Sequence, residues 1–483
     1  MEPCIPDIVW QGWELQHLFS GNADGIVAEE TFQGVTVDSR RPAVGGIFVA
    51  LRGRMVDAHT KIPEAFAGGV RLAIVEQRMW VFFPAEWHQR YRCLPTADPL
   101  KALGELARLH RQRFTTPVVV VAGSAGKTTT KEMLASVLGR RFCVLKTEGN
   151  ENNSLGVPLT LLRLRPEHEV VVIEMGTSSF GEIARLCQIA QPTHGIITAI
   201  GEEHLEYLGS LAGVLREETV LVRYLQSHGG TVVLPAGSGL EQEYSGAWTF
   251  GLTPEADIAA EVTYDGEGYP VLHLRYGGEH CHCRLRVLGP AGAHAAVATA
   301  AVAWTLGLGL QELVEGLSTY EPQSSGQGYG RMLLVELPNG VRLLNDTYNA
   351  NPLSMRVALE TLRQLPCSGR RWAVLGDMLE LGSAVEIAHR AALEQARESA
   401  EIVCVLGEAF ARVAAGYPDV HIFASHEELA EQLRREAQPG DLVLLKGSRG
   451  MAMEYVLNLY QQRVGAVKGS YAVSSGALDM EDL

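Results

Sequence analysis

Runs of apolar residues recur along the chain and predict an α/β protein. The run TPVVVVA at 116–122 is continuous and β-branched, which is typical of a strand buried on both faces of a parallel sheet. Further strands are predicted at 170–174 and 195–200, and a helical period lies between them over 181–189. This order of strand, helix and strand predicts a doubly wound central domain.

The segments on either side of this centre predict two more α/β sheets. Short apolar runs at 34–38 and 46–51 alternate with Gly, Pro and Asp turns, so we expect a small α/β module at the beginning. The stretch 318–330 is rich in Pro, Ser, Gln and Gly and interrupts the pattern as a linker does. Ser425, three residues before Glu428, supplies a capping box for a later helix. The strands of a second parallel sheet are expected at 341–344, 372–375, 402–406 and 442–445.

These patterns divide the chain into three domains and a tail. At roughly 150 residues per domain, a length of 483 residues agrees with three. The last residues, 469–483, carry an SSG turn and acidic positions without an apolar period, which predicts a flexible end. We place a small N-terminal α/β domain at 1–98, a central domain with a parallel sheet at 99–320, a C-terminal α/β domain at 321–466 and the tail at 467–483.

Composition excludes several classes of protein. With 46% hydrophobic and 20% charged residues, and no apolar run near the roughly 18 residues of a membrane helix, we expect a soluble protein without an integral membrane segment. The 41 basic and 56 acidic residues leave a net charge of −15, which argues against a broad nucleic-acid-binding surface. Eight cysteines without a repeating spacing, and no signal peptide, favour the cytoplasm.

The strongest local signal is a glycine-rich turn between the strand at 116–122 and a helical pattern at 129–138. It reads Gly-Ser-Ala-Gly-Lys-Thr at 123–128. Backbone N–H groups at such a turn point at an anion, Lys127 adds a positive charge, and the hydroxyl of Thr128 is suited to magnesium. A turn with a purely structural role is the alternative, but the strand-to-helix context favours nucleotide binding.

Polar side chains follow other predicted strands. Glu174 ends one strand and His204 follows the next, so both are candidates for magnesium surroundings at the carboxyl edge of a sheet, or are capping and solvated groups. Asn150, Asn152 and Asn153 form an amide-rich run that suits a polar substrate or is an Asn-rich turn. The segment NDTYNANP at 345–352 places more polar groups at a strand end.

Three other segments are expected to be structural. The HCHC run at 280–283 lacks a second ligand pair at zinc-site spacing and alternates as a strand does. The aromatic residues between 80 and 91 suit a domain core or an interface better than a ligand site. The Ala-rich segment 295–303 predicts a close-packed helix.

Together these motifs resemble the Mur ligase family over nearly the whole chain. The NDTYNANP and VLGDMLELG runs are similar to those of the members that add a terminal dipeptide. The matching stretches are VDSR from residue 37, GSAGKTTTKEM from 123, EGNENNSLGVPLTLL from 148, EMGTSSFGEI from 174, ITAIGEEHLEYLGS from 197, NDTYNANPLSM from 345, VLGDMLELG from 374 and LLKGSR from 444.

The resemblance implies an activity and a use for each domain. It implies a ligase of peptidoglycan precursor synthesis that uses ATP and Mg²⁺. Such an enzyme joins D-alanyl-D-alanine to UDP-N-acetylmuramoyl-tripeptide through an acyl phosphate. The N-terminal domain would bind the UDP-sugar, the central domain would be the P-loop ATPase, and the C-terminal domain would be Rossmann-like. We expect a monomer.

The resemblance also implies roles for individual residues. Lys127 would contact the β- and γ-phosphates, and Thr128, Glu174 and His204 would surround magnesium. The other implied ATP contacts are Gly123, Ser124, Ala125, Gly126, Thr129, Arg331 and Asp346. The implied substrate contacts are Ser39, Arg40, Asn150, Asn153, Tyr348, Asn349, Asn351, Lys446 and Ser448.

Four features depart from the family pattern. Glu218 stands where the family has a carbamoylated lysine near magnesium, so its carboxylate could replace the carbamate directly. Ala295 and Ala298 replace two amides that contact adenine, and Ala199 and the segment 232–239 also differ. Two alternatives therefore stay open: a related ligase with another amine substrate or nucleotide, and a non-catalytic partner in cell-wall assembly.

Overall fold

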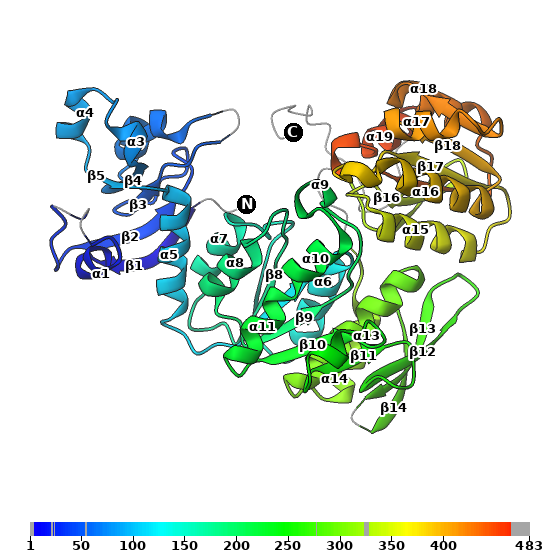
Figure 1. Ribbon diagram of the computed structural model, residues 1–483, viewed down its shortest axis with the longest axis horizontal. Coiled ribbons are helices and arrows are strands. Elements are labelled where there is room, and N and C mark those ends of the chain that lie inside the picture. Colours follow the sequence, from blue (N-terminus) through cyan, green and yellow to red (C-terminus); the bar gives the residue numbers. More distant parts are fainter. Residues whose placement is uncertain are drawn as a thin grey trace. The chain divides into compact units, whose positions relative to one another are not determined.

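The computed structural model describes residues 4–464 except 21–22, 24, 54–55, 277 and 323–327. Its strands form three sheets that follow one another along the chain, each accompanied by helices (Figure 1). The predicted three-domain α/β fold class is therefore confirmed, while the exact domain boundaries stay predictions. The predicted tail at 467–483 and the middle of the predicted linker at 318–330 lie outside the described residues.

The N-terminal sheet has five strands in the order β1-β2-β3-β4-β5. Its first pair is antiparallel and the other pairs are parallel. Trp80 is buried, and Phe83, Trp87 and Tyr91 pack against the same core, so the aromatic run is structural as predicted. The elements are β1 Cys4–Gln11, α1 Gly12–Leu18, β2 Thr31–Thr36, β3 Ile47–Val49, η1 Ala58–Lys61, α2 Ile62–Ala67, β4 Leu72–Glu76, α3 Gln77–Trp80, α4 Ala85–Arg90, β5 Cys93–Thr96 and α5 Pro99–Arg111.

The central sheet has nine strands in the order β14-β13-β12-β11-β10-β9-β6-β8-β7. The pairs from β6 through β9, β10 and β11 to β12 are parallel, but β12, β13 and β14 pair antiparallel. The parallel sheet predicted for this region is therefore confirmed, and antiparallel pairs extend it at the edge formed by β12, β13 and β14. The strands are β6 Val118–Ala122, β7 Val144–Lys146, β8 Val170–Glu174, β9 His194–Ile197, β10 Thr231–Pro235, β11 Trp248–Gly251, β12 Ile258–Tyr264, β13 Pro270–Tyr276 and β14 Glu279–Arg284.

The helices of the central region follow the predicted periodicity. All five residues of β6 are buried, as expected from its β-branched run, and the Ala-rich helix α13 packs closely against α6. The predicted HCHC run forms strand β14. The helices are α6 Lys127–Leu138, α7 Gly156–Leu162, α8 Glu182–Ala190, α9 Leu205–Leu208, α10 Leu211–Glu218, α11 Val220–Ser227, α12 Leu240–Glu243, α13 Gly289–Thr305 and α14 Leu310–Thr319.

The C-terminal sheet has six strands in the order β15-β16-β20-β17-β18-β19. The four predicted strands correspond to β16, β17, β18 and β20, which pair parallel as predicted, and the edge strand β15 pairs antiparallel with β16 through a tight turn at 337–340. Ser425 accepts the N–H of Glu428, as the predicted cap requires. The elements are β15 Leu333–Glu336, β16 Arg342–Asp346, α15 Pro352–Gln364, β17 Arg371–Gly376, η2 Gly382–Ala384, α16 Val385–Ser399, β18 Ile402–Leu406, α17 Glu408–Ala414, β19 Val420–Phe423, α18 His426–Glu436, β20 Leu442–Lys446, η3 Arg449–Met451 and α19 Glu454–Val464.

Two apolar cores flank the C-terminal sheet. Helices α15, α16 and α17 share one core with one face of the strands, and α18 and α19 share the other (Figure 1). Alternate residues of β17 show the division, since Leu375 belongs to the first core and Trp372 to the second. Helices on both faces leave the carboxyl ends of the strands as the place for polar chemistry.

The chain divides into two compact units. The first comprises Met1–Val118, Leu145–Met175 and Ala184–Pro192. The second comprises Val119–Val144, Gly176–Ile183 and Thr193–Leu483. The glycine-rich turn, His204, Glu218 and the C-terminal sheet therefore belong to the second unit, whereas Glu174 and the asparagine run belong to the first.

Candidate functional site

The glycine-rich turn connects β6 to α6, and two of its glycines adopt conformations that other residues disfavour. Gly123 has φ 118° and Gly126 has φ 83°. A Cβ atom at Gly123 would lie 2.6 Å from the hydroxyl oxygen of Thr198 and 2.7 Å from the carbonyl oxygen of Ala199. Only glycine fits this close approach, so the turn is packed tightly onto the segment that follows β9.

Hydrogen bonds from that segment hold the turn in place. The Thr198 hydroxyl lies within hydrogen-bonding distance of the carbonyl oxygens of Ala122, at 3.0 Å, and Ala125, at 2.7 Å. The Ser124 N–H donates to the carbonyl of Ala199 at 2.7 Å, and the Gly201 N–H donates to the Ser124 hydroxyl at 3.0 Å. The sequence analysis did not single out Thr198, whose only signal was its place at the end of a strand.

Two buried carboxylates lie beside the turn. Glu218, the last residue of α10, is fully buried and accepts the Gly123 N–H at 2.9 Å. Glu203 is 7% exposed and lies 3.6 Å from the ammonium of Lys127, which also donates to the Gly123 carbonyl at 2.5 Å. The Oε1 atoms of Glu203 and Glu218 are both buried and accept no hydrogen bond within the described part of the chain.

Burial is the main influence on the protonation of Glu218. It raises the pKa of that carboxyl to about 8, and the nearby charge of Glu203 raises it as well. The ammonium of Lys127 and the N–H of Gly123 act in the opposite direction. Glu203 itself was missed by the sequence analysis, although it immediately precedes the predicted His204.

In the first unit, Glu174 ends β8 as predicted and is almost fully buried. Its Oε1 accepts the side-chain amide of Asn152 at 2.8 Å, and its N–H donates to Thr147 Oγ1 at 3.0 Å. Asn153 uses its side-chain oxygen to accept the N–H of Gly156 at 3.0 Å, as a turn before α7 requires. Asn152, which contacts Glu174, belongs to the predicted amide-rich run, although the resemblance implied a role only for Asn150 and Asn153.

His204 lies between β9 and α9, with a φ of 48°. Its Nδ1 is 2.5 Å from Oε2 of Glu380, a residue of the loop that follows β17. Glu380 was not predicted, although it belongs to the VLGDMLELG run. The two residues are 176 positions apart, so no local pattern could have paired them.

The predicted residues of the C-terminal sheet meet at the carboxyl ends of two adjacent strands. Asp346 ends β16 and pairs in register with Lys446, which ends β20. The buried Lys446 ammonium donates to Asp346 Oδ2 at 2.6 Å and to the Asn349 carbonyl at 2.9 Å. The guanidinium of Arg331 lies 3.6 Å from the ring centre of Tyr348, which is a cation–π arrangement.

Two further predicted residues brace this edge. Asn351 is the N-cap of α15 and accepts the N–H of Ser354 at 2.8 Å, while its amide donates to the carbonyl of Ser124 at 3.1 Å. Ser448 donates to the carbonyl of Ala350 at 2.9 Å. Through Asn351, the NDTYNANP segment reaches the glycine-rich turn within the second unit.

Ser39 and Arg40 follow β2 in the first unit. The Arg40 guanidinium binds both carboxylate oxygens of Asp38, at 3.0 and 2.9 Å. These hydrogen bonds hold the pKa of Asp38 below its ordinary value. Ser39 is largely buried, whereas Arg40 is 81% exposed and accessible to an anionic ligand.

The positions that lack the family's amides are part of the core. Ala295 and Ala298 lie in α13 and are buried, and the neighbouring His294 ring meets the Phe250 ring edge-on at 5.1 Å. Burial lowers the pKa of His294. Small apolar side chains here allow α13 to pack closely against α6.

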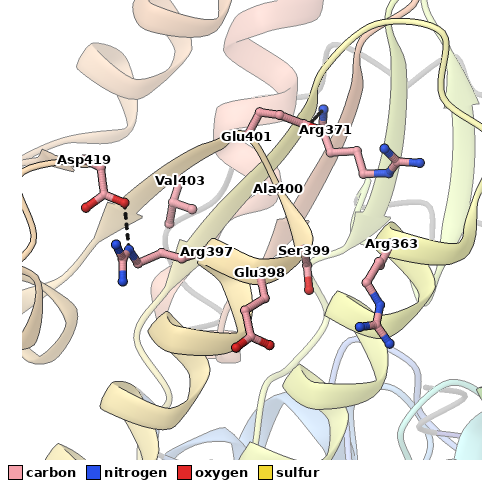
Figure 2. A pocket seen from close by; sticks show the side chains of 9 residues that line it. All are labelled: Arg363, Arg371, Arg397, Glu398, Ser399, Ala400, Glu401, Val403 and Asp419. Carbon is pink, nitrogen blue, oxygen red and sulfur yellow. Dashed lines mark hydrogen bonds and ion pairs between the residues drawn. The ribbon is translucent and has the colours of Figure 1, made fainter.

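A pocket of about 460 Å³ in the C-terminal sheet lies away from these residues (Figure 2). Its lining includes Arg371 at the start of β17 and residues 399–401 just before β18, so it is at the amino ends of the strands. Figure 2 shows Arg397 paired with Asp419, at 2.7 Å. None of the predicted site residues lines it.

The protein side chains alone do not form a complete set of ligands for magnesium. Across residues 4–464, outside the gaps, no three His, Cys, Asp or Glu side chains are grouped to hold a metal ion. Mg²⁺ in phosphoryl-transfer sites uses few protein ligands and completes its shell with phosphate and water oxygens, so the hydroxyl and carboxylates present fit such a site. Among the described helices, none combines the length and apolar character needed to cross a membrane.

Residues 121–303 match the Mur ligase middle domain, and residues 330–449 match the Mur ligase, glutamate ligase domain. The UDP-N-acetylmuramoyl-tripeptide–D-alanyl-D-alanine ligase of Bacillus subtilis is 32% identical, over 89% of this chain and 93% of the relative. The ligase of the same name from Escherichia coli is also 32% identical, over 93% and 98%.

Solved structures agree with these relatives. Crystal structure I of MurF from Acinetobacter baumannii has a TM-score of 0.84 and 30% identity, covering 94% of this chain and all of that one. MurF ligase from Thermotoga maritima in complex with ADP has a TM-score of 0.79 and 26% identity, covering 89% and 97%. The matched domains span most of the region that carries the glycine-rich turn, Glu218 and the NDTYNANP segment, and this chain belongs to the Mur ligase family.

Proposed function

We propose that the protein is an ATP-dependent ligase that joins D-alanyl-D-alanine to UDP-N-acetylmuramoyl-tripeptide in peptidoglycan precursor synthesis. The observation that carries this proposal is the hydrogen bond from Asn351 to the Ser124 carbonyl. It brings the NDTYNANP segment, which resembles the dipeptide-adding ligases, to the turn that binds phosphate. Relatives of that name match about nine-tenths of the chain.

The reaction proceeds in two steps. The terminal carboxylate of the tripeptide attacks the γ-phosphorus of ATP, which forms an acyl phosphate and releases ADP. The amine of the dipeptide then attacks the acyl carbon, and inorganic phosphate leaves. The protein positions the reactants and neutralises phosphate charge, which is the main contribution of enzymes to phosphoryl transfer. Lys127 supplies the positive charge, and N–H groups of the turn supply hydrogen-bond donors to the phosphates.

Four residues are proposed to hold Mg²⁺, which neutralises phosphate charge when bound. They are Thr128, Glu174, His204 and Glu218. Thr128 lies in the first turn of α6, Glu174 ends β8, His204 precedes α9 and Glu218 ends α10. All but His204 offer the oxygen ligands that Mg²⁺ prefers. The unpaired, buried Oε1 of Glu218 supports its use in place of a carbamate.

The remaining predicted residues are proposed to bind nucleotide and substrate. Ser39 and Arg40 contact the uridine diphosphate, and the exposed guanidinium of Arg40 supports this role. Asn150 and Asn153 orient the sugar-peptide. The turn residues Gly123, Ser124, Ala125, Gly126 and Thr129 contact ATP together with Arg331 on its phosphates and Asp346 on its ribose, and Tyr348, Asn349, Asn351, Lys446 and Ser448 contribute the C-terminal side of the site.

Release of phosphate from ATP tests the proposal. Purified protein is incubated with UDP-N-acetylmuramoyl-tripeptide, with and without D-alanyl-D-alanine, and the product is identified by mass spectrometry. We expect phosphate release that depends on the dipeptide and a pentapeptide product. Release that depends on a different amine would identify a related ligase, and no release with ATP, GTP or any amine would favour a non-catalytic assembly partner.

The same protein is proposed to act as a cytoplasmic monomer that does not bind nucleic acid. Light scattering on the purified protein tests the monomer, with a mass near 52.4 kDa expected. A mass near twice that value would contradict it. The net charge of −15 is unsuited to a polyanionic partner.

The buried alanines in α13 make nucleotide selectivity a separate question. Ala295 and Ala298 carry no side-chain group that could bond adenine, and each neutral hydrogen bond contributes about 0.5–1.5 kcal/mol. Their loss should cost about 2- to 13-fold in selectivity per bond. Comparing kcat/KM for ATP and GTP measures this, and a strong preference for ATP would mean that other groups recognise the base.

A further inference from the structure

The loop after β17 is docked onto helix α9 within the second unit. His204 Nδ1 lies 2.5 Å from Glu380 Oε2, and the N–H of Glu206 donates to the Glu380 carbonyl at 3.1 Å. Side chain and backbone of one residue therefore both hold the start of α9. The apolar residues of the same contact are Leu205, Leu208, Val214 and Ala384.

The loop that carries Glu380 is itself held from the C-terminal sheet. The Met378 N–H donates to Nε2 of the buried His389 at 3.0 Å. The Leu379 N–H donates to the buried Ser448 hydroxyl at 2.9 Å. Because these bonds precede Glu380 directly, its side chain is presented from an ordered backbone.

The contact between Glu380 and His204 is polar and partly open to solvent. The exposed fractions of the two side chains are 47% and 28%, so the pair adds little to the stability of the fold. Both residues also have positive φ values, 62° and 48°, a backbone conformation that few non-glycine residues adopt and that is enriched at functional sites. An exposed pair on an unfavourable backbone indicates a function other than stability.

The chemistry of the pair sets the state of the imidazole. A carboxylate only accepts, so Nδ1 of His204 carries the hydrogen of this bond, and in the neutral imidazole the lone pair is on Nε2. Histidines that bind metals usually donate their other ring N–H to a carboxylate or carbonyl, which fixes the ring and raises its basicity. Glu380 has the chemical group and the geometry for that role.

We propose that Glu380 is a positioning residue that orients His204 toward Mg²⁺. The proposal rests on the assignment of His204 to magnesium under the proposed function. Because Glu380 belongs to the C-terminal sheet, the magnesium surroundings in the central sheet are complete only when the loop at 377–382 is docked. Opening of that loop therefore lowers metal affinity before any chemistry takes place.

Binding of Mn²⁺ in the presence of ADP tests this without turnover. Electron paramagnetic resonance measures the Mn²⁺ dissociation constant for the wild type and for Glu380→Ala, Glu380→Gln and the control Glu386→Gln. Glu386 is an exposed carboxylate of α16 that pairs with Arg390. We expect the Mn²⁺ dissociation constant to rise about 10- to 100-fold in Glu380→Ala. The rise should be smaller in Glu380→Gln, which keeps an acceptor oxygen, and the control should match the wild type.

Hydrogen exchange separates orientation from misfolding. The Glu206 amide is protected by the Glu380 carbonyl, so exchange over 204–210 reports whether the loop is docked. Weaker Mn²⁺ binding by Glu380→Gln with unchanged exchange supports the proposal, since the loop is then still in place. Wild-type affinity in Glu380→Ala overturns it, as does a wild type that does not bind Mn²⁺ with ADP. If the Mn²⁺ affinities of the variants change as expected but the wild type has no ligase activity, only the proposed function is contradicted.

Discussion

Replacing Glu218 by glutamine should change how the stability of the central sheet depends on pH. In the metal-free protein, burial raises the pKa of this carboxyl from 4.5 to about 8. The folded protein therefore keeps a proton that the unfolded chain loses between these values. The stability that this proton supports is fully present below pH 4.5 and is lost as the pH rises toward 8.

The magnitude follows from the two pKa values. Between these pKa values, the free energy of unfolding of the wild type falls by about 1.4 kcal/mol per pH unit relative to a variant that does not titrate at this position. From pH 5 to pH 8, the free energy of unfolding of Glu218→Gln should therefore rise by about 3–4 kcal/mol relative to that of the wild type. The glutamine side chain has the same shape and still accepts the Gly123 N–H, so packing is preserved. For a cooperative unit of about 150–250 residues, this gain is a shift of roughly 6–16 °C in melting temperature.

Calorimetry in chelator across pH 5–8 measures the effect. Glu243→Gln, an exposed carboxylate of α12, is the control and should follow the wild type. Parallel melting curves for the wild type and Glu218→Gln would refute the reasoning, because they would mean that the folded and unfolded states bind this proton equally. Only the difference between the proteins is interpreted, since other groups titrate in both.

The same substitution addresses the magnesium role of Glu218. If its carboxylate binds Mg²⁺, turnover of Glu218→Gln should fall sharply and require more Mg²⁺, without restoration by added bicarbonate. Mg²⁺ with ADP should also release a proton from the wild type near pH 7.5 and not from the variant, as calorimetry in buffers of different ionisation enthalpy detects. Unchanged turnover would remove Glu218 from the magnesium surroundings.

Three further predictions concern the turn and the C-terminal sheet. Lys127→Ala should lower phosphate release by about 100-fold or more, because the turn loses its positive charge; near-normal release would contradict the assigned role. Thr198→Val removes the donor shared by two carbonyls of the turn, so we expect a loss of about 1 kcal/mol in stability and weaker ADP binding by calorimetry. Asp441 accepts from Arg370 and Trp372, and these bonds hold its pKa below the ordinary value although burial opposes them. Asp441→Asn should lower the free energy of unfolding by about 2–3 kcal/mol at neutral pH, and this difference from the wild type should shrink as the pH falls below 3.8. A difference that stays constant with pH would contradict the ion-pair explanation.

Contiguous patterns were sufficient for much of the fold. The β-branched run of β6 and the periodic helices each depend on neighbours within about ten residues, so their signal is present in the sequence. The turn from Gly123 to Thr128 is read in the same way, because its chemistry belongs to consecutive backbone groups. Strand pairing at the sheet edges was harder to predict from the sequence, since the antiparallel pairing of β12 to β14 depends on how the connecting turns close rather than on strand composition.

The sequence by itself thus determined the α/β class, the position of the glycine-rich turn and the resemblance to the Mur ligases. The tertiary structure alone decided which distant side chains complete the turn. Glu218 meets Gly123 across 95 positions, and Asn351 meets Ser124 across 227. Such contacts follow from the packing of whole sheets and helices, where the order of strands, not the spacing of residues, sets which groups become neighbours. Glu203, Thr198 and Glu380 lie within the family-like runs, but no role for them followed from the sequence, because a carboxylate or hydroxyl acquires its role from the partner that folding places beside it.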